Sequence, residues 1–192
     1  QTDVAQLSQD DPQAQEKALA QLHAGIDRAS RLVDQLLTLS RLDSLDSLDG
    51  VEQIAMADLL QSAVMDIYPP AQQAGIDIRL HINAPEVTRT GQQLLLSLLV
   101  RNLLDNATRY SPRGSVVDVT LNTQSFTVRD NGPGISPDAL ARLGERFYRP
   151  PGQDATGSGL GLSIVKRIAA LHGMRVSLGN APEGGFEVKV NW

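Results

Sequence analysis

The sequence predicts a two-layer α/β sandwich, a mixed sheet with helices on one face, preceded by a helical hairpin. Apolar residues repeat with helical spacing up to about residue 42. After Gly50, strand-like segments alternate with helical ones, which is typical of a sheet covered by helices. The stretch 131–156 is rich in Gly, Pro and Arg, and loops of that length inside a compact domain are usually functional lids.

The N-terminal region has the pattern of two helices of unequal length. Residues 12–42 carry a seam suited to pairing with another helix, formed by Leu22, Ile26, Ala29, Val33 and Leu36. Residues 1–9 form a shorter helical segment, which Asp10-Asp11-Pro12 interrupts, because Asp is favoured just before a helix and Pro just inside one. We therefore expect residues 1–48 to form the hairpin, ending in a linker around Gly50, and residues 49–192 to form the sandwich.

The sandwich region predicts strands and helices in a definite order. Its first half contains a short strand, a helix that Pro69 and Pro70 should kink or restart, a second strand and a strongly apolar helix, at residues 51–55, 57–74, 76–80 and 92–109. Its second half contains two strands joined by a hairpin turn, the long loop, a helix closed by Gly173 and two final strands, at residues 116–121, 125–129, 131–156, 160–171, 175–178 and 186–190.

The composition narrows the classes of function. The net charge is −5, so the chain lacks the basic field with which proteins bind nucleic acid, and we expect no nucleic-acid partner. It has no cysteine, which excludes disulfides, thiolate metal sites and a cysteine nucleophile. There is no apolar run of about 18 residues, so we expect no membrane contact from this chain. It begins within a helical pattern and without methionine, and we expect a piece of a longer protein whose membrane segment lies upstream.

Two amides lie one helical turn apart in the apolar helix. Asn102 and Asn106 therefore share one face of that helix. An amide oxygen is a neutral, hard ligand suited to Mg²⁺ beside phosphate groups. Arg109 follows, and its guanidinium can bind phosphate bidentately. Taken alone, the two amides fit a polar helix surface or a cap better than a metal site.

An acidic turn follows the predicted strand at 125–129. The segment Asp130-Asn131-Gly132-Pro133-Gly134-Ile135 places a carboxylate before residues that forbid regular structure. That carboxylate can accept a hydrogen bond from the exocyclic amine of adenine, worth about 1.5–3 kcal/mol. The two glycines let the backbone approach a base without an intervening Cβ. An ordinary Asp-Asn-Gly turn explains the same residues taken alone.

A glycine-rich segment precedes the helix at 160–171. In Gly157-Ser158-Gly159-Leu160-Gly161-Leu162, bare backbone N–H groups and the start of the helix can hold phosphate. The segment is not a P-loop, because no Lys-Ser/Thr follows the glycines, and its spacing differs from the dinucleotide fingerprint. A flexible hinge is the other interpretation, and both hold if the long loop closes over a ligand.

Together and in this order, these clusters resemble the N, G1 and G2 boxes of the sensor histidine kinases of bacterial two-component systems. Residues 145–149 resemble the intervening F box, and Gly184-Gly185-Phe186 the last glycine box. The resemblance covers essentially the whole chain. It implies the Bergerat-type ATP-binding fold shared with gyrase and MutL, ATP and Mg²⁺ as cofactors, catalytic roles for Asn102 and Asn106, and Asn106 as metal ligand. The nucleotide-binding residues that it implies are Asn102, Asn106, Arg109, Tyr110, Asp130, Gly132, Gly134, Ile135, Arg149, Gly157, Ser158, Gly159, Leu160, Gly161 and Leu162.

The resemblance also implies a reaction and its partners. The γ-phosphoryl of ATP would pass to a histidine on an upstream helix and then to an aspartate of a response regulator. The hairpin would pair with a second protomer in a dimeric four-helix bundle, and the chain would be the cytoplasmic portion of a bacterial inner-membrane protein. None of His23, His81 and His172 carries the acceptor pattern, a His followed by an acidic residue with Pro five positions after the His. We therefore expect the acceptor upstream of Gln1, and no self-phosphorylation by this chain.

Two other functions stay open. One is a serine-directed kinase or an ATPase of the same fold. ATPases of this fold place a water-activating Glu where this chain has Asn102, and an amide cannot act as a general base, so we expect slow ATP hydrolysis. The other is a degenerate module that has lost ATP and serves as an interaction domain. Asn106, Asp130 and the three glycines of the 157–161 segment argue against it.

Overall fold

The computed structural model describes residues 12–150 and 157–192. The chain divides into two compact units, residues 1–40 and 41–192. Helix α2 (Pro12–Asp43) makes up the described part of the first unit and extends into the second, which confirms the helix predicted at 12–42. The shorter arm predicted at 1–9 lies outside the described residues. Ile26 and Val33 of the predicted seam are 65% and 52% exposed, so α2 leaves large apolar side chains uncovered.

The second unit is built on a five-stranded mixed sheet. Its strand order is β2-β4-β5-β7-β6. Strand β2 pairs in parallel with β4, and the other neighbours pair antiparallel. The strands comprise β2 (Asp77–Ile82), β4 (Val116–Asn122), β5 (Ser125–Asp130), β6 (Arg175–Asn180) and β7 (Phe186–Asn191).

The sheet has one apolar and one polar face. Along β4, Val117, Val119 and Leu121 are fully buried, and the residues between them are only half-buried. Side chains alternate between the two faces of a strand, so the buried set lies on a single face. The sequence pattern of β4 therefore decides which face of the sheet the helices cover.

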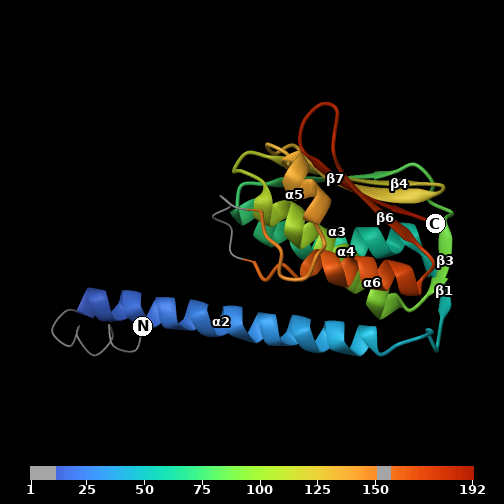
Figure 1. Cartoon of the computed structure of the whole chain (residues 1–192). Coiled ribbons are helices and arrows are strands. Elements are labelled where there is room, and N and C mark those ends of the chain that lie inside the picture. The colour runs from blue at the N-terminus through green and yellow to red at the C-terminus, as the bar shows by residue number, and fades with distance from the viewer. Residues whose placement is uncertain (1–11, 151–156) are drawn as a thin grey trace. The chain divides into compact units, whose positions relative to one another are not determined.

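Three helices cover the apolar face: α3 (Met56–Gln73), α4 (Gln93–Tyr110) and α6 (Gly161–Leu171) (Figure 1). Helix α4 contacts both of the other helices and also β5. Leu99 and Leu103 of α4 and Ile164 of α6 are almost completely buried at this layer. The helices and the sheet thus form the predicted two-layer sandwich, which is confirmed.

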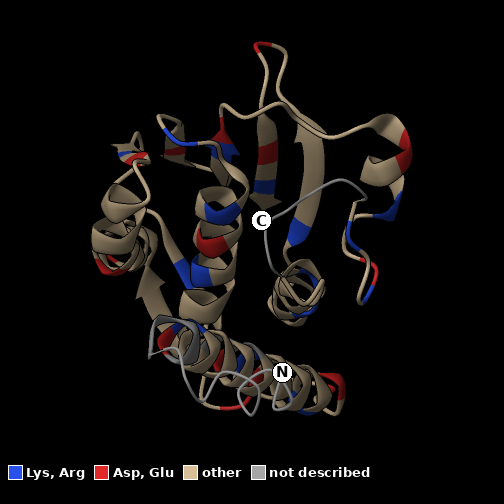
Figure 2. Ribbon diagram, turned by 90° about the vertical axis from the view of Figure 1, so that its left-hand side faces the viewer, with Lys and Arg blue, Asp and Glu red and all other residues tan. Residues whose placement is uncertain are grey.

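Charged residues are spread over the elements. Figure 2 shows basic and acidic positions interspersed along the helices and strands of the sandwich.

Among the helices that the structure describes, none has the length and apolar character needed to cross a bilayer.

Three local features differ from the predictions. Strand β3 (Thr88–Gly91), which pairs antiparallel with β1 (Glu52–Ala55), was not predicted, because Thr-Arg-Thr-Gly lacks apolar alternation. Helix α5 (Pro137–Arg142) lies within the predicted loop, and its N-cap Ser136 accepts a hydrogen bond from the Ala139 amide. The restart predicted at Pro69 and Pro70 does not occur. Helix α3 continues through both residues to Gln73, and the Pro70 carbonyl still accepts the Ala74 N–H at 3.1 Å.

Candidate functional site

The two amides of α4 face the start of α6. Asn102 is buried, and its Nδ2 donates to the Leu98 carbonyl at 2.8 Å, one turn earlier in the helix. A Cβ added at Gly161 would lie 3.3 Å from both Asn102 Oδ1 and Asn106 Nδ2. Both amides therefore meet the backbone of the glycine segment across the α4–α6 interface. Because Gly161 has no side chain, the space between its backbone and the two amides stays open.

Asp130 ends β5 and is buried at 7% exposure. Its Oδ1 accepts two backbone hydrogen bonds, from Gly132 N at 2.9 Å and from Phe186 N at 3.1 Å. Its Oδ2 has no hydrogen-bond partner among the residues that the structure describes, and it is not sealed from solvent. The two amides therefore orient the carboxylate and leave one oxygen available to a ligand.

The loop after Asp130 is held by residues distant in sequence. Gly134 has a φ of +73°, a conformation that favours glycine. The Asn180 side chain accepts a hydrogen bond from Ile135 N at 2.8 Å and donates one to Ile135 O at 2.7 Å. Sequence reasoning missed Asn180, because Asn at the end of a strand is an ordinary turn residue.

The glycine segment 157–161 packs against α4 and the region that resembles the F box. A Cβ at Gly157 would lie 2.9 Å from the Tyr110 hydroxyl and 3.8 Å from Arg109 Nη1. Gly159 has a φ of +72°, and its carbonyl accepts the Phe147 N–H at 3.1 Å. A Cβ at Gly159 would lie 2.7 Å from the Phe147 carbonyl carbon, so only glycine fits this approach.

The rest of the segment leads into α6. Ser158 Oγ accepts the Leu160 N–H at 3.1 Å. Leu160 is fully buried and anchors the segment in the core, and Leu162 is half-buried in the first turn of the helix. The structure thus brings the resemblance-implied residues of α4 and of the glycine segment together. Arg149 is exposed and lies in the loop after α5, apart from these residues in the sequence.

Two arginines, one in the loop after α5 and one in α6, contact the end of α2 within the second unit. Arg146 donates to Asp43 Oδ2 at 2.7 Å, and the Arg167 guanidinium of α6 donates to the carbonyls of Leu42 and Leu45 at 3.1 and 2.6 Å. Neither arginine role was predicted. These contacts attach the helix end to the elements that carry the glycine segment.

Each of the three histidines makes a polar contact with another residue of the chain. His23 is exposed on α2, and its Nδ1 lies 2.9 Å from the Leu19 carbonyl. At the end of α6, His172 Nε2 accepts the Gln92 N–H at 3.1 Å, and Nδ1 lies 2.8 Å from the Ile168 carbonyl. Because Nε2 accepts a hydrogen bond, it carries no hydrogen of its own, and the hydrogen on Nδ1 is donated to the Ile168 carbonyl. His81 lies on β2 with Nε2 3.2 Å from Asp118 Oδ1.

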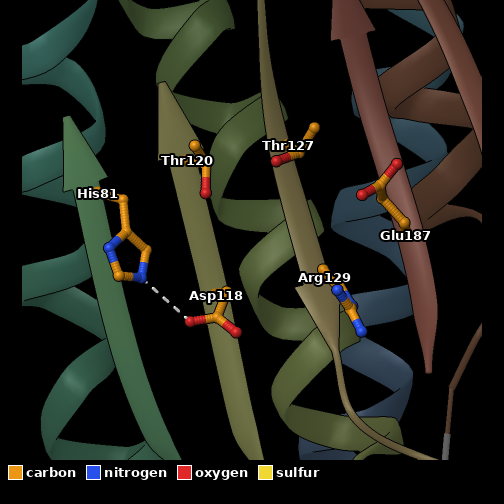
Figure 3. Close-up of a pocket in the computed structure, with 6 residues that line it drawn as sticks. All are labelled: His81, Asp118, Thr120, Thr127, Arg129 and Glu187. Carbon is orange, nitrogen blue, oxygen red and sulfur yellow. Dashed lines mark hydrogen bonds and ion pairs between the residues drawn. The ribbon is translucent and has the colours of Figure 1, made fainter. Parts of the chain in front are cut away.

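A polar hollow of about 260 Å³ lies on the sheet face opposite the helices (Figure 3). It contains none of the residues that the sequence singles out for a nucleotide site. Its side chains come from β2, β4, β5 and β7 and are His81, Asp118, Thr120, Thr127, Arg129 and Glu187. Asp118 and Arg129 are direct cross-strand neighbours, as are Arg129 and Glu187, so opposite charges face each other across this surface.

Comparison with known proteins shows which family the chain belongs to. The family described as histidine kinase-, DNA gyrase B-, and HSP90-like ATPase matches residues 91–192, more than half of the chain. The chain belongs to this ATPase family. It is 76% identical over all 192 of its residues to the sensor protein QseC of Escherichia coli (strain K12), of which it spans 43%. The residues at 36–42 and in the loop at 131–156 also favour a QseC-like member of the family.

Solved structures of this ATPase family agree in fold. The structure of the cytoplasmic segment of histidine kinase QseC has a TM-score of 0.64 and 63% sequence identity, covering 87% of this chain and 93% of that one. Full-length ShkA in complex with AMPPNP has a TM-score of 0.78 and 28% identity, covering 92% of this chain and 38% of that one. The predicted resemblance to sensor histidine kinases is thereby confirmed.

Proposed function

We propose that this chain is the ATP-binding catalytic region of a sensor histidine kinase. One observation carries the proposal: the Asn102 and Asn106 side chains lie beside the backbone of Gly161, where the glycine segment leads into α6. Amide oxygens suit a metal ion, and the N–H groups at the start of a helix suit phosphate, so together they suit a nucleoside triphosphate with its metal ion. The likeness to ShkA, whose structure contains AMPPNP, supports the same ligand here.

The base end of the nucleotide belongs to Asp130. Its available Oδ2 is suited to accept the exocyclic amine of adenine, while Oδ1 stays bonded to Gly132 and Phe186. Gly132, Gly134 and Ile135 form the loop beside this carboxylate. Because the carboxylate is already oriented by two backbone donors, it needs no rearrangement to recognise the base.

The phosphate end belongs to α4 and the glycine segment. The amide oxygen of Asn106 would hold Mg²⁺, which when bound supplies charge neutralisation to the phosphates. No described group of three or more His, Cys, Asp or Glu side chains is arranged to hold a metal, so amide and phosphate oxygens make up the proposed donor set. Backbone N–H groups of the segment 157–162 other than that of Leu160, which donates to Ser158 Oγ, would hold the phosphates together with Arg109, Tyr110 and Arg149.

The chemistry assigned to this chain is positioning and charge neutralisation. In phosphoryl transfer the reacting oxygens must be held in line, and little covalent work falls on the protein. The acceptor would be a histidine on an upstream helix of a longer protein, since His23, His81 and His172 lack the acceptor pattern and lie in structural surroundings. The chain spans 43% of QseC, which leaves room for such a helix in proteins of that length.

The partners follow from the same proposal. Residues 1–48 would belong to the phosphotransfer helices, and the exposed seam of α2 would pair with a second protomer. The phosphoryl would then pass to an aspartate of a response regulator. The longer protein would be anchored in the bacterial inner membrane, with this chain on the cytoplasmic side.

A nucleotide titration tests the proposal. The protein should bind AMPPNP saturably, and Mg²⁺ should tighten the binding. Asp130→Asn should weaken it roughly 10- to 100-fold, the cost of a hydrogen bond to a charged group. Asp118→Asn, the same change on the opposite face of the sheet, is the matched control and should leave the affinity unchanged. Absence of binding by the parent protein, or equal affinity in both variants, would contradict the assignment.

A turnover assay separates the kinase from an ATPase of the same fold. Asn102 stands where an ATPase would need a carboxylate base, so this chain should hydrolyse ATP slowly and acquire no phosphoryl group itself. Steady-state phosphate release measures the first expectation, and labelling with γ-³²P ATP measures the second. Rapid hydrolysis would favour the ATPase.

A further inference from the structure

The Asn180 side chain binds the main chain of the base-side loop at two points. Its Oδ1 accepts from Ile135 N at 2.8 Å, and its Nδ2 donates to Ile135 O at 2.7 Å. An amide has one acceptor and one donor group, so this pairing matches both backbone groups of a single residue. The two residues are 45 positions apart in sequence. The contact therefore joins the hairpin after β6 to the loop after β5.

The loop has little else to hold it at this point. Residues 133–136 are in no helix or strand, and within the described residues the Ile135 backbone makes no hydrogen bond other than the pair to Asn180. The preceding Gly134 has a φ of +73°, and a Cβ there would lie 2.9 Å from Asn180 Oδ1. The glycine thus lets the loop come close enough for the amide to bind it.

Asn180 is itself held firmly. It is paired with Phe186 across the β6–β7 ladder, and the turn between them is closed by hydrogen bonds from Ala181 N to Gly185 O and from Gly184 N to Ala181 O, both 3.0 Å. Phe186 N also donates to Asp130 Oδ1 at 3.1 Å. The same hairpin therefore orients the carboxylate and holds the loop beside it.

We infer that Asn180 is a positioning residue for the nucleotide base. It keeps residues 132–135 in the conformation that forms one wall of the base site, without touching the reacting phosphates. This inference rests on the proposed nucleotide-binding function. A loop that samples other conformations lowers the apparent affinity by the fraction of molecules in the competent one, so the effect of Asn180 falls on the base end of the ligand.

The test uses two variants and a matched control. Asn180→Ala removes the amide, and Asn180→Leu keeps a side chain of similar size without hydrogen bonds. Both should raise the Kd of AMPPNP roughly three- to tenfold, the range expected when one or two neutral hydrogen bonds are lost. Asn83→Ala removes an amide that bonds to Asn122 at 2.9 Å, at the other end of the sheet, and should keep the parent Kd.

Three further readouts separate positioning from a general loss of structure. The ratio of the Kd values for GMPPNP and AMPPNP should fall in both Asn180 variants, because a loosened loop discriminates less between bases. In the nucleotide-free protein, the Ile135 amide should be protected from hydrogen exchange in the parent and in Asn83→Ala, and should exchange freely in both Asn180 variants. Urea midpoints should stay near that of the parent, since Asn180 is exposed.

The outcomes distinguish this inference from the function on which it rests. If the parent protein does not bind AMPPNP, the proposed function fails and the inference fails with it. If the parent binds but Asn180→Ala retains the parent Kd and the parent base ratio, only the inference is overturned. Parent-like binding by Asn180→Leu would show that side-chain bulk, and not the hydrogen bonds, holds the loop, which also overturns it.

Discussion

Beside the proposed base site, Gly185 is the position that tolerates an added side chain least. It has a φ of +89°, and a Cβ there would overlap the Asp130 carbonyl oxygen, lie 2.7 Å from its carbonyl carbon and 3.0 Å from Asn131 Cα. All three are backbone atoms at the end of β5. They cannot move aside as the tip of a flexible side chain would, so Gly185→Ala must displace either the hairpin or the strand end.

The same substitution at the neighbouring Gly184 separates the cost of backbone strain from the cost of steric overlap. Gly184 has a φ of +95° with nothing within 4 Å of an added Cβ, so Gly184→Ala carries backbone strain alone, about 1–3 kcal/mol. Gly185→Ala carries the same strain plus the overlap, for which overpacking gives another 1–3 kcal/mol or so. We therefore expect Gly185→Ala to lower the free energy of unfolding by about 1–3 kcal/mol more than Gly184→Ala does.

Displacement of the backbone at Gly185 should also weaken nucleotide binding. The Phe186 N–H, the next residue along, orients the Asp130 carboxylate. The affinity for AMPPNP should thus fall by about tenfold or more in Gly185→Ala, equivalent to losing one hydrogen bond to a charged group. Urea unfolding and calorimetric titration of both variants measure the two effects. Equal stability and equal affinity in the two variants would refute the argument from close approach.

Three other predictions follow from single contacts. Gly161→Ala should weaken Mg²⁺-dependent AMPPNP binding severalfold, because the added Cβ crowds both α4 amides at 3.3 Å. Gly179→Ala, with open space around it, is the control, and unchanged binding in Gly161→Ala would contradict the proposed metal position. Arg167→Ala should cost about 1–3 kcal/mol in urea unfolding, because the carbonyls of Leu42, in the last turn of α2, and of Leu45, just after it, each lose a donor. Arg146→Ala breaks an ion pair whose arginine is 55% exposed and should cost less than about 1 kcal/mol. A larger cost for Arg146→Ala than for Arg167→Ala would refute this. His172→Ala should cost about 1–3 kcal/mol, because the Gln92 N–H loses its acceptor, and an unchanged urea midpoint would show that this bond contributes nothing.

The sequence alone determined the elements and the chemistry of the motifs. Period-two alternation along β4 and the apolar pattern of α4 are properties of adjacent residues, so they can be recognised before folding. Side-chain chemistry likewise identified the two α4 amides, Asp130 and the glycine segment as a candidate nucleotide site. Where local pattern was weak, as in β3 and α5, prediction failed, because pairing with β1 and capping by Ser136 stabilise those elements.

Only the tertiary structure decided how the site is held together. The bond between Asn180 and Ile135 joins residues 45 positions apart, and the one between Phe186 and Asp130 spans 56. The contact of Arg167 with the end of α2 spans 125. Asp130, Ile135 and Phe186 each stand in a motif that the sequence singles out, but nothing in local spacing or residue type marks which residue each of them contacts. Each contact exists only once the chain has brought distant segments within hydrogen-bonding distance. The sequence therefore indicates which groups are candidates for the chemistry, and the fold determines which other residues hold those groups in position.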